Sequence, residues 1–259
     1  MMNSDRMFIC GCLAASVVSF AAYADDTPAP ANNDCGNSCL FKLENFGFSE
    51  TIKAYNFDGD NSITEFNSTL TFTPSKEWNA HVSLPVINQD SVSTGMLEVG
   101  ADFLVASNLC KFVDSFSIGL DLELPTANAD FGGNSVNTIV SADLDGKVGI
   151  ADLKWGAGVS NQWTTDATYA PLFGGLVEGD IFNANAMLGH SFADGKFCVG
   201  ANYNYWNLDG TGEIHTIGPS FVVHFSSNFD MEFGWDIPFS EFDGSQVDDV
   251  FTVGASLKF

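Results

Sequence analysis

The sequence has very few basic residues, and its only arginine, Arg6, stands close to the N-terminus. The whole chain has 9 Lys and Arg against 33 Asp and Glu, which gives a formal net charge of −24 at pH 7. This balance disfavours nucleic-acid binding, because phosphate neutralisation requires basic side chains. It also disfavours an anion-selective pore, since such pores use rings of Arg or Lys. Cations, uncharged solutes and apolar compounds remain as candidate ligands.

Long hydrophobic runs are missing beyond the N-terminus. The apolar run Met7–Ala22 follows Arg6 and leads into Ala22-Tyr23-Ala24, a small-x-small cleavage site, so residues 1–24 are predicted to be a secretory signal peptide. A lipoprotein signal at Cys12 is a weaker interpretation, because the residues after it stay apolar. No other segment approaches the roughly 18 apolar residues of a membrane-spanning helix. A mature chain of this kind can cross a membrane only as a closed barrel.

Motifs of hydrolytic enzymes are also absent. The sequence contains no Gly-x-Ser-x-Gly and no His-Glu-x-x-His, and it lacks the His-x-Ser-Asn-Gly arrangement of the outer-membrane phospholipase. His190 and Ser191 are neighbours, but adjacent residues of a strand face opposite sides, so His190 would not activate Ser191. Carboxylates are abundant, but the sequence does not indicate two of them positioned as a general acid and a general base. We therefore expect no enzyme and no catalytic residue.

What the chain does have is strict alternation of apolar and polar residues. In Asp114–Thr126 every second residue from Phe116 to Leu124 is apolar, whereas those between are Ser, Gly, Asp and Glu. A period of two is typical of a strand with one apolar and one polar face. The pattern recurs up to Val250–Phe259 at the C-terminus. Recurrent amphipathic strands of roughly ten residues predict an all-β, antiparallel transmembrane β-barrel.

The expected barrel occupies residues 46–259 and has 12 strands, an even number that places both chain ends on one side. Residues 25–45 are expected to form an N-terminal periplasmic leader or a plug. The strands are expected at Phe46–Asn56, Ser62–Thr73, Glu77–Val86, Met96–Ala106, Asp114–Leu124, Asn137–Lys147, Leu153–Trp163, Asp180–Phe192, Phe197–Leu208, Ile214–Phe225, Phe229–Ile237 and Val250–Phe259. One turn is placed near Gly149–Asp152, where the apolar parity switches, although Asp145-Gly146 is itself a turn pair. Short periplasmic turns are expected to alternate with longer outer loops.

The residues that alternate with the apolar residues along each strand are expected to line the lumen. The predicted lumen residues are Glu65, His81, Glu98, Asp102, Asp121, Glu123, Asp143, Lys154, His224, Asp230, Glu232, Asp236 and Lys258, with Lys53 and Lys147 on the same parity. One interpretation is an acidic wall that favours cations or polar solutes. The other is an internal network of salt bridges and hydrogen bonds that fills a narrow barrel. The excess of acids over bases argues against complete mutual pairing.

Four cysteines follow the signal segment, namely Cys35, Cys39, Cys110 and Cys198. Export to an oxidising compartment favours disulfides. Cys35 and Cys39 are close enough to form a small ring, and Cys110 and Cys198 are expected near one rim of the barrel. Four cysteines allow three pairings, among which the sequence does not choose. Cys-x-x-Cys pairs and matching His spacing are missing, so disulfides or free thiols are favoured over a metal site.

One short segment resembles the calcium loop of an EF-hand. Its oxygen ligands would be Asn56, Asp58, Asp60 and Ser62. Asn61 stands where that loop requires glycine, and Asn67 stands where it requires a bidentate glutamate. The favoured alternative is an Asp-Gly hairpin with solvated carboxylates. Any calcium bound here is expected to be weak, and no other cofactor is expected.

Two strand ends and the C-terminus carry a family resemblance. Ser83–Ile87 reads Ser-Leu-Pro-Val-Ile, Leu122–Thr126 reads Leu-Glu-Leu-Pro-Thr, and Phe259 is a terminal aromatic residue. With its strand layout over Phe46–Phe259, the chain resembles the outer-membrane proteins associated with meta-pathway phenol degradation. The resemblance implies a barrel that transports aromatic or other hydrophobic compounds. Phe259 also resembles the signal read by the barrel-assembly machinery.

Together these observations predict a porin-like channel or transporter for small solutes in the outer membrane of a diderm (Gram-negative) bacterium. The expected partners are outer-membrane lipids, the barrel-assembly machinery and a small solute, without nucleic acid. The sequence does not indicate the oligomeric state. One alternative is a non-conducting structural or surface-interaction barrel whose outer loops, Thr164–Gly179 and Pro238–Asp249, bind partners. The other alternative is a soluble β-sandwich.

Overall fold

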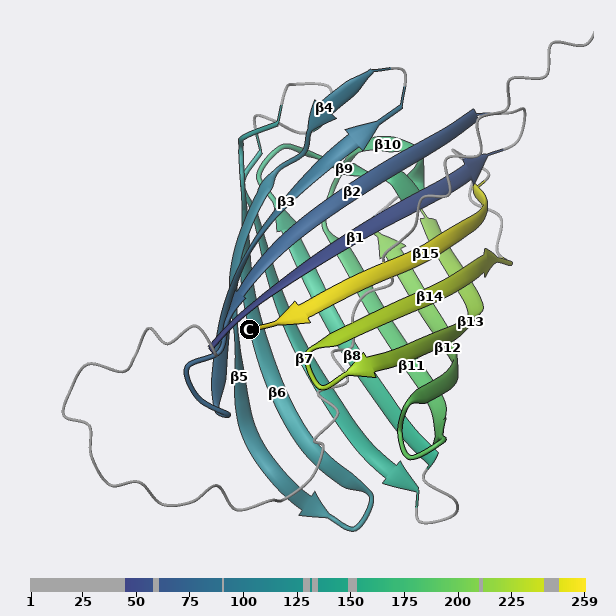
Figure 1. The fold of residues 1–259 in the computed structure, drawn as a ribbon. Coiled ribbons are helices and arrows are strands. Elements are labelled where there is room, and N and C mark those ends of the chain that lie inside the picture. Colours follow the sequence, from purple (N-terminus) through teal and green to yellow (C-terminus); the bar gives the residue numbers. More distant parts are fainter. Residues whose placement is uncertain are drawn as a thin grey trace, which may run out of the picture.

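The structure is a computed structural model that describes residues 45–57, 61–89, 91–127, 131, 135–148, 153–209, 212–239 and 247–259. The expected signal peptide and all of the expected leader except Asn45 lie outside these ranges, as do Cys35 and Cys39. Within them, 12 long antiparallel strands close into a barrel (Figure 1). No helix in this described part is long and apolar enough to span a bilayer.

Each long strand pairs with its neighbour in the chain, and the last strand pairs with the first. The strands are β1 (Phe46–Phe57), β2 (Asn61–Phe72), β3 (Trp78–Asn88), β5 (Leu97–Cys110), β6 (Val113–Leu124), β7 (Asn137–Val148), β8 (Leu153–Thr164), β11 (Ile181–Phe192), β12 (Phe197–Leu208), β13 (Gly212–Ser226), β14 (Phe229–Pro238) and β15 (Val247–Lys258). The barrel closes where β15 pairs with β1, from Gly47 opposite Lys258 to Phe57 opposite Val247. The predicted fold class and strand number are therefore confirmed.

The strand boundaries follow the sequence pattern except where the pairing is irregular. Val148 of β7 pairs with Leu153 of β8, so these strands end on either side of residues 149–152, where the turn was predicted and which lie outside the described residues. The largest difference is at β5, which continues to Cys110 instead of ending at Ala106. Register shifts between Leu104 and Ala106 and again before Cys110 interrupt the alternation there. Because a bulge shifts the alternation of side chains, the end of this strand could not be predicted from the sequence pattern.

Short elements that the alternation did not reveal lie at one end of the barrel. They are β4 (Val92–Thr94), β9 (Ala167–Ala170), the 3-10 turn η3 (Pro171–Phe173) and β10 (Gly175–Glu178). Figure 1 shows β4, β9 and β10 at the top of the barrel, here named the long-loop end. The opposite, short-turn end holds the tight links 193–196 and 227–228. The start of β1 and the end of β15 lie together at the short-turn end, where the Phe259 amide donates to the Phe46 carbonyl at 3.0 Å.

The two faces of each strand differ in exposure. On β6, Ile118, Leu120 and Leu122 are 39%, 48% and 41% exposed, whereas Gly119 between them is buried. Exposed apolar residues recur on every long strand of the outer surface, with Phe48, Leu70 and Phe251 as examples. A continuous apolar belt of this kind would be unfavourable in water but is solvated by lipid tails. The outer surface is therefore suited to contact with membrane lipid. The polar residues that alternate with the apolar ones along each strand face the interior of the barrel.

Candidate functional site

The interior carries a band of carboxylates on neighbouring strands. Register pairs place Ser83, Glu98, Glu123 and Asn137 in one cross-strand row, and Asn79, Asp102, Gly119 and Ser141 in another. Between these rows His81 and Asp121 flank Gly100. Asp143 and Asp145 follow on β7 toward the short-turn end. We name Glu98, Asp102, Asp121, Glu123, Asp143 and Asp145 the acidic wall.

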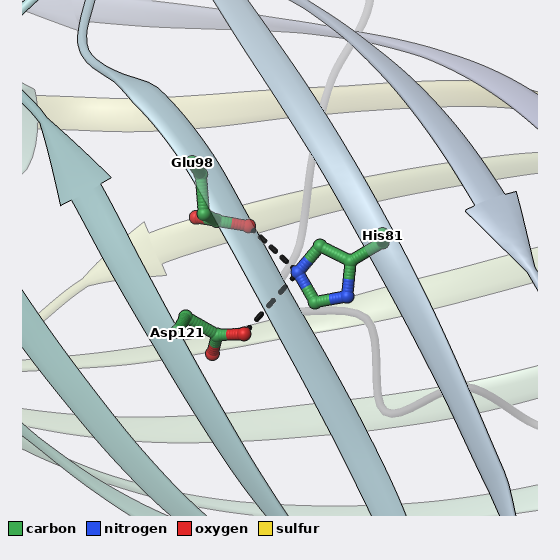
Figure 2. Close-up of side chains that lie close together, drawn as sticks. All are labelled: His81, Glu98 and Asp121. Carbon is green, nitrogen blue, oxygen red and sulfur yellow. Dashed lines mark hydrogen bonds and ion pairs between the residues drawn. The ribbon is translucent and has the colours of Figure 1, made fainter.

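His81 lies between three members of the acidic wall. Its Nε2 atom is 3.1 Å from Oε1 of Glu98 and 3.2 Å from Oδ1 of Asp121. Figure 2 shows both carboxylates beside this nitrogen. The Nδ1 atom of His81 is 4.0 Å from Oδ2 of Asp102. Among the described residues, these are the only ion pairs that the acidic wall makes. The wall therefore keeps a large excess of carboxylates over cationic partners.

Glycines opposite these side chains let them lie flat against the wall. A Cβ atom at Gly100 would overlap the Asp121 carboxylate and lie 2.6 Å from Cε1 of His81. A Cβ atom at Gly119 would likewise lie 2.6 Å from Oδ1 of Asp102. The missing side chains are what permit these close approaches.

Glu123 connects the acidic wall to the long-loop end. Asn137 Nδ2 donates to Glu123 Oε2, and Gln162 Nε2 donates to the same oxygen at 3.1 Å. Both amides also donate to Thr168 Oγ1 of β9, at 2.7 Å and 3.3 Å respectively. Asn137 and Thr168 are almost completely buried. The hairpin β9–β10 is thus tied by hydrogen bonds to the inner face of the barrel.

Apolar side chains fill the long-loop end. One buried cluster contains Tyr55, Ile63, Ile87, Phe131, Val247 and Val250, and a second contains Phe173, Ile181, Leu208 and Ile214. Leu172 packs against both clusters, although they come from different parts of the wall. We name these residues the apolar cap. It consists of aliphatic and aromatic side chains from the strands and from the loop elements at this end.

Tyr169 lies at the edge of the apolar cap, outside the membrane-spanning strands. Its ring packs edge-on against Phe131, with the centroids 4.8 Å apart, and its hydroxyl donates to Gln89 Oε1 at 3.3 Å. Burial, together with the charge of Glu65, raises the pKa of the Tyr169 phenol well above its ordinary value. The hydroxyl therefore stays a donor at any physiological pH.

The remaining predicted lumen residues lie on other strands, of which we name the pair β13 and β14 the other wall. Asp230, Glu232 and Asp236 alternate along β14, and His224 Nδ1 is 2.6 Å from Asp230 Oδ1. Tyr55 donates to Glu65 Oε2 at 3.4 Å. The polar parity also carries Lys53, Lys154 and Lys258. Contact between any of these residues and a passing solute stays a prediction.

Several polar residues of the interior were not selected from the sequence. The structure adds Asp145, Asn137, Gln162, Asn183 and Thr168 to it. Asp145 shares its parity with Asp143, so the alternation could have found it. Uncharged amides give no comparable signal, and Thr168 lies on a short loop strand where the alternation stops.

A disulfide between Cys110 and Cys198 was one possible pairing, and the structure contradicts it, because both thiols are free. Four strands, β6, β7, β8 and β11, separate β5 from β12 in the sheet. Neighbouring strands are about 4.8 Å apart, so the two residues are well beyond the roughly 7 Å limit between Cα atoms. Sharing a rim of the barrel did not bring them together.

The predicted calcium loop is only partly described, since Asp58 and Asp60 lie outside the described residues. Asn56 and Ser62 stand directly opposite each other across β1 and β2. The Asn56 side-chain amide donates to Asp249 Oδ1. Calcium binding at this hairpin stays a prediction.

A closed antiparallel barrel with an apolar outer belt and a polar interior defines the class of transmembrane β-barrels. Within that class, residues 44–248 match the family model described as "Putative MetA-pathway of phenol degradation". The chain belongs to this family, which confirms the resemblance drawn from the strand ends. No curated protein sequence matches the chain significantly.

Solved outer-membrane channels share the fold. An outer membrane channel from Pseudomonas putida F1 is similar with a TM-score of 0.61 and 11% identity, covering 88% of this chain and 100% of that one. The KdgM porin has a TM-score of 0.55 and 12% identity, covering 82% and 99%. A second KdgM structure, in complex with disordered oligogalacturonate, has a TM-score of 0.56 and 13% identity, with the same coverage. At these identities the similarity shows the fold alone.

Proposed function

We propose that the chain is a passive outer-membrane channel for small cationic or uncharged solutes, including apolar aromatic compounds. The observation that carries the proposal is the acidic wall, whose described ion pairs all go to His81. Carboxylates without basic partners in a polar interior attract cations and repel anions. The proposed location is the outer membrane of a diderm bacterium, with the long-loop end outside and outer-membrane lipids around the apolar belt.

The apolar cap supports the aromatic part of the proposal. The apolar cap places the aromatic side chains of Tyr55, Phe131 and Phe173 at the long-loop end, where a solute would enter. Aromatic and aliphatic side chains favour partners with an apolar body. The family's association with phenol degradation points to the same chemistry. We infer no catalytic role, so the barrel would conduct its solute unchanged.

Single-channel recording in a planar bilayer with a KCl gradient tests the proposal. We expect discrete conductance steps and a reversal potential that indicates preference for potassium. The double substitution Asp121→Asn with Glu123→Gln should lower the ratio of cation to anion permeability roughly twofold or more. The reason is that both carboxylates belong to the acidic wall and neither has a Lys or Arg partner among the described residues.

Glu50→Gln is the matched control. Glu50 shares the outward parity of Phe48 and accepts a hydrogen bond from Ser68 Oγ at 2.7 Å, so its charge does not face the interior. This control should leave the reversal potential unchanged. Equal shifts in both variants would show that net charge, and not the acidic wall, sets the selectivity. That outcome would refute the proposed role of the wall.

A second function is favoured by one observation. The apolar cap joins loop residues Phe131, Leu172 and Phe173 to the inner face of the strands. A barrel closed in this way would be a non-conducting surface protein whose outer loops bind partners. Protein that is folded, as judged by heat-modifiable migration on gels, yet electrically silent would favour this function over the channel.

A further inference from the structure

Two carboxylates compete for one ring nitrogen in the acidic wall. Nε2 of His81 donates at most one hydrogen bond, and Oε1 of Glu98 is placed to receive it at 3.1 Å. Oδ1 of Asp121 lies 3.2 Å from the same nitrogen, but it is buried and has no hydrogen-bond partner. Two carboxylates this close repel each other in a medium of low dielectric constant. A single imidazole proton cannot compensate both of them.

We propose that His81, Glu98 and Asp121 bind a divalent transition-metal ion of the Zn²⁺ type. The ligands would be Nε2 of His81, Oε1 of Glu98 and Oδ1 of Asp121, which lie within 4.8 Å of one another. One imidazole nitrogen with two carboxylate oxygens is a donor set that suits zinc and similar ions. An ion at their centre would satisfy the orphan oxygen of Asp121 and neutralise both carboxylates.

Two of the three separations between the ligand atoms fit such an ion. Ligands about 2.0–2.2 Å from a metal lie roughly 2.8–3.6 Å apart, from the neighbouring corners of an octahedron to those of a tetrahedron. The two nitrogen-to-oxygen distances, 3.1 Å and 3.2 Å, fall in this range. The long side chain of Glu98 has enough torsional freedom to bring its oxygen into place. Figure 2 shows both carboxylates converging on the same nitrogen.

The surroundings hold these ligands in position. His81, Glu98 and Asp121 come from β3, β5 and β6, three neighbouring strands that fix the backbone separations. Asp102 Oδ2 lies 4.0 Å from Nδ1 of His81, on the side away from the proposed ion. A carboxylate there attracts a proton on Nδ1 electrostatically and so favours the tautomer that leaves Nε2 free to bind metal. Gly100 leaves the space between His81 and Asp121 open, because a Cβ atom would overlap the Asp121 carboxylate.

The donor set also predicts selectivity among ions. Calcium takes six to eight oxygen ligands and does not favour an imidazole nitrogen. Three protein ligands leave positions that lumen water can fill, so the ion would be exchangeable. The proposal does not depend on solute passage, because binding can be measured whether or not the barrel conducts.

Zinc titration of the folded, full-length protein in detergent, in competition with a zinc-responsive dye, tests the site. In the His81→Ala variant the affinity of this site for zinc should be at least about tenfold weaker than in the unchanged protein. The titration should therefore show one fewer equivalent of tightly bound zinc. Asp121→Asn should weaken binding by a similar factor at constant size, and Asp102→Asn should weaken it about tenfold through loss of the favoured tautomer. Calcium at the same concentrations should not displace the zinc.

His224→Ala is the control, because His224 lies on the other wall and pairs with the single carboxylate of Asp230. It should bind zinc like the unchanged protein, and the cysteines are identical in every variant. Equal zinc binding by the His81→Ala variant, or an equal loss in the control, would overturn the proposal. Channels that conduct without binding zinc would refute the metal site alone, whereas zinc binding by a silent barrel would refute the proposed channel alone.

Discussion

Replacing residues 165–178 by Asn-Gly should raise the single-channel conductance roughly threefold or more. The register of β8 and β11 ends with Gln162 opposite Ile181. Extended by two residues, it would place Thr164 opposite Gly179, where a two-residue type I′ turn could join them. The replacement removes Leu172, which packs against both clusters of the apolar cap, and Phe173, which belongs to one of them. It also removes Thr168, which accepts hydrogen bonds from Asn137 and Gln162 on the inner face. Planar-bilayer recording measures the effect directly.

A smaller change distinguishes the effect of the apolar cap on conductance from the effect of the whole loop. Leu172→Ala with Phe173→Ala keeps the hairpin β9–β10 and its Thr168 hydrogen bonds but removes apolar volume from the cap. We expect a conductance between that of the unchanged protein and that of the loop replacement. If the replacement folds normally and its conductance is unchanged, the hairpin does not restrict the pathway.

Gly218→Ala should destabilise the barrel by at least about 3 kcal/mol, through overpacking that cannot relax. A Cβ atom at Gly218 would overlap the carbonyl oxygen of Trp235 and lie 2.6 Å from its carbonyl carbon. These are backbone atoms of the paired strand β14, so no side-chain rotation relieves the overlap. Urea-induced unfolding in lipid vesicles, followed by heat-modifiable migration on gels, measures the loss.

Gly254→Ala is the matched control on β15. Its nearest neighbour would be Oγ1 of Thr51 at 3.7 Å, an ordinary van der Waals contact. This variant should unfold within about 1 kcal/mol of the unchanged protein. Equal stability of the two variants would contradict the prediction. It would show that β13 and β14 can move apart at Gly218 without loss of unfolding free energy.

The number and the faces of the strands could be predicted because both are local properties of the sequence. In β6 the alternation from Phe116 to Leu124 specifies which side chains share a face without knowledge of any neighbour. The even strand number then follows from the repetition of this pattern, whereas the acidic lumen stays a prediction from composition. The same argument failed at the end of β5, where bulges after Leu104 break the period.

The contacts between strands could not be predicted in this way, since parity gives the face but not the register. His81, Glu98 and Asp121 were each expected to line the lumen, yet only the pairing of β3, β5 and β6 brings them to one point. Loop strands carry no alternation long enough to read, so the contacts of Thr168 and Leu172 with the interior were missed. Cys110 and Cys198 show the converse, because a shared rim did not place them within reach of each other.

The sequence alone thus determined an acidic, antiparallel barrel with an apolar outer belt, because a period of two and a scarcity of basic residues need no tertiary information. The tertiary structure decided where Gly100 would leave room for Asp121 and where Leu172 would join the two halves of the apolar cap. The physical reason is that register and loop packing depend on residues far apart in the chain, which meet only when the barrel closes.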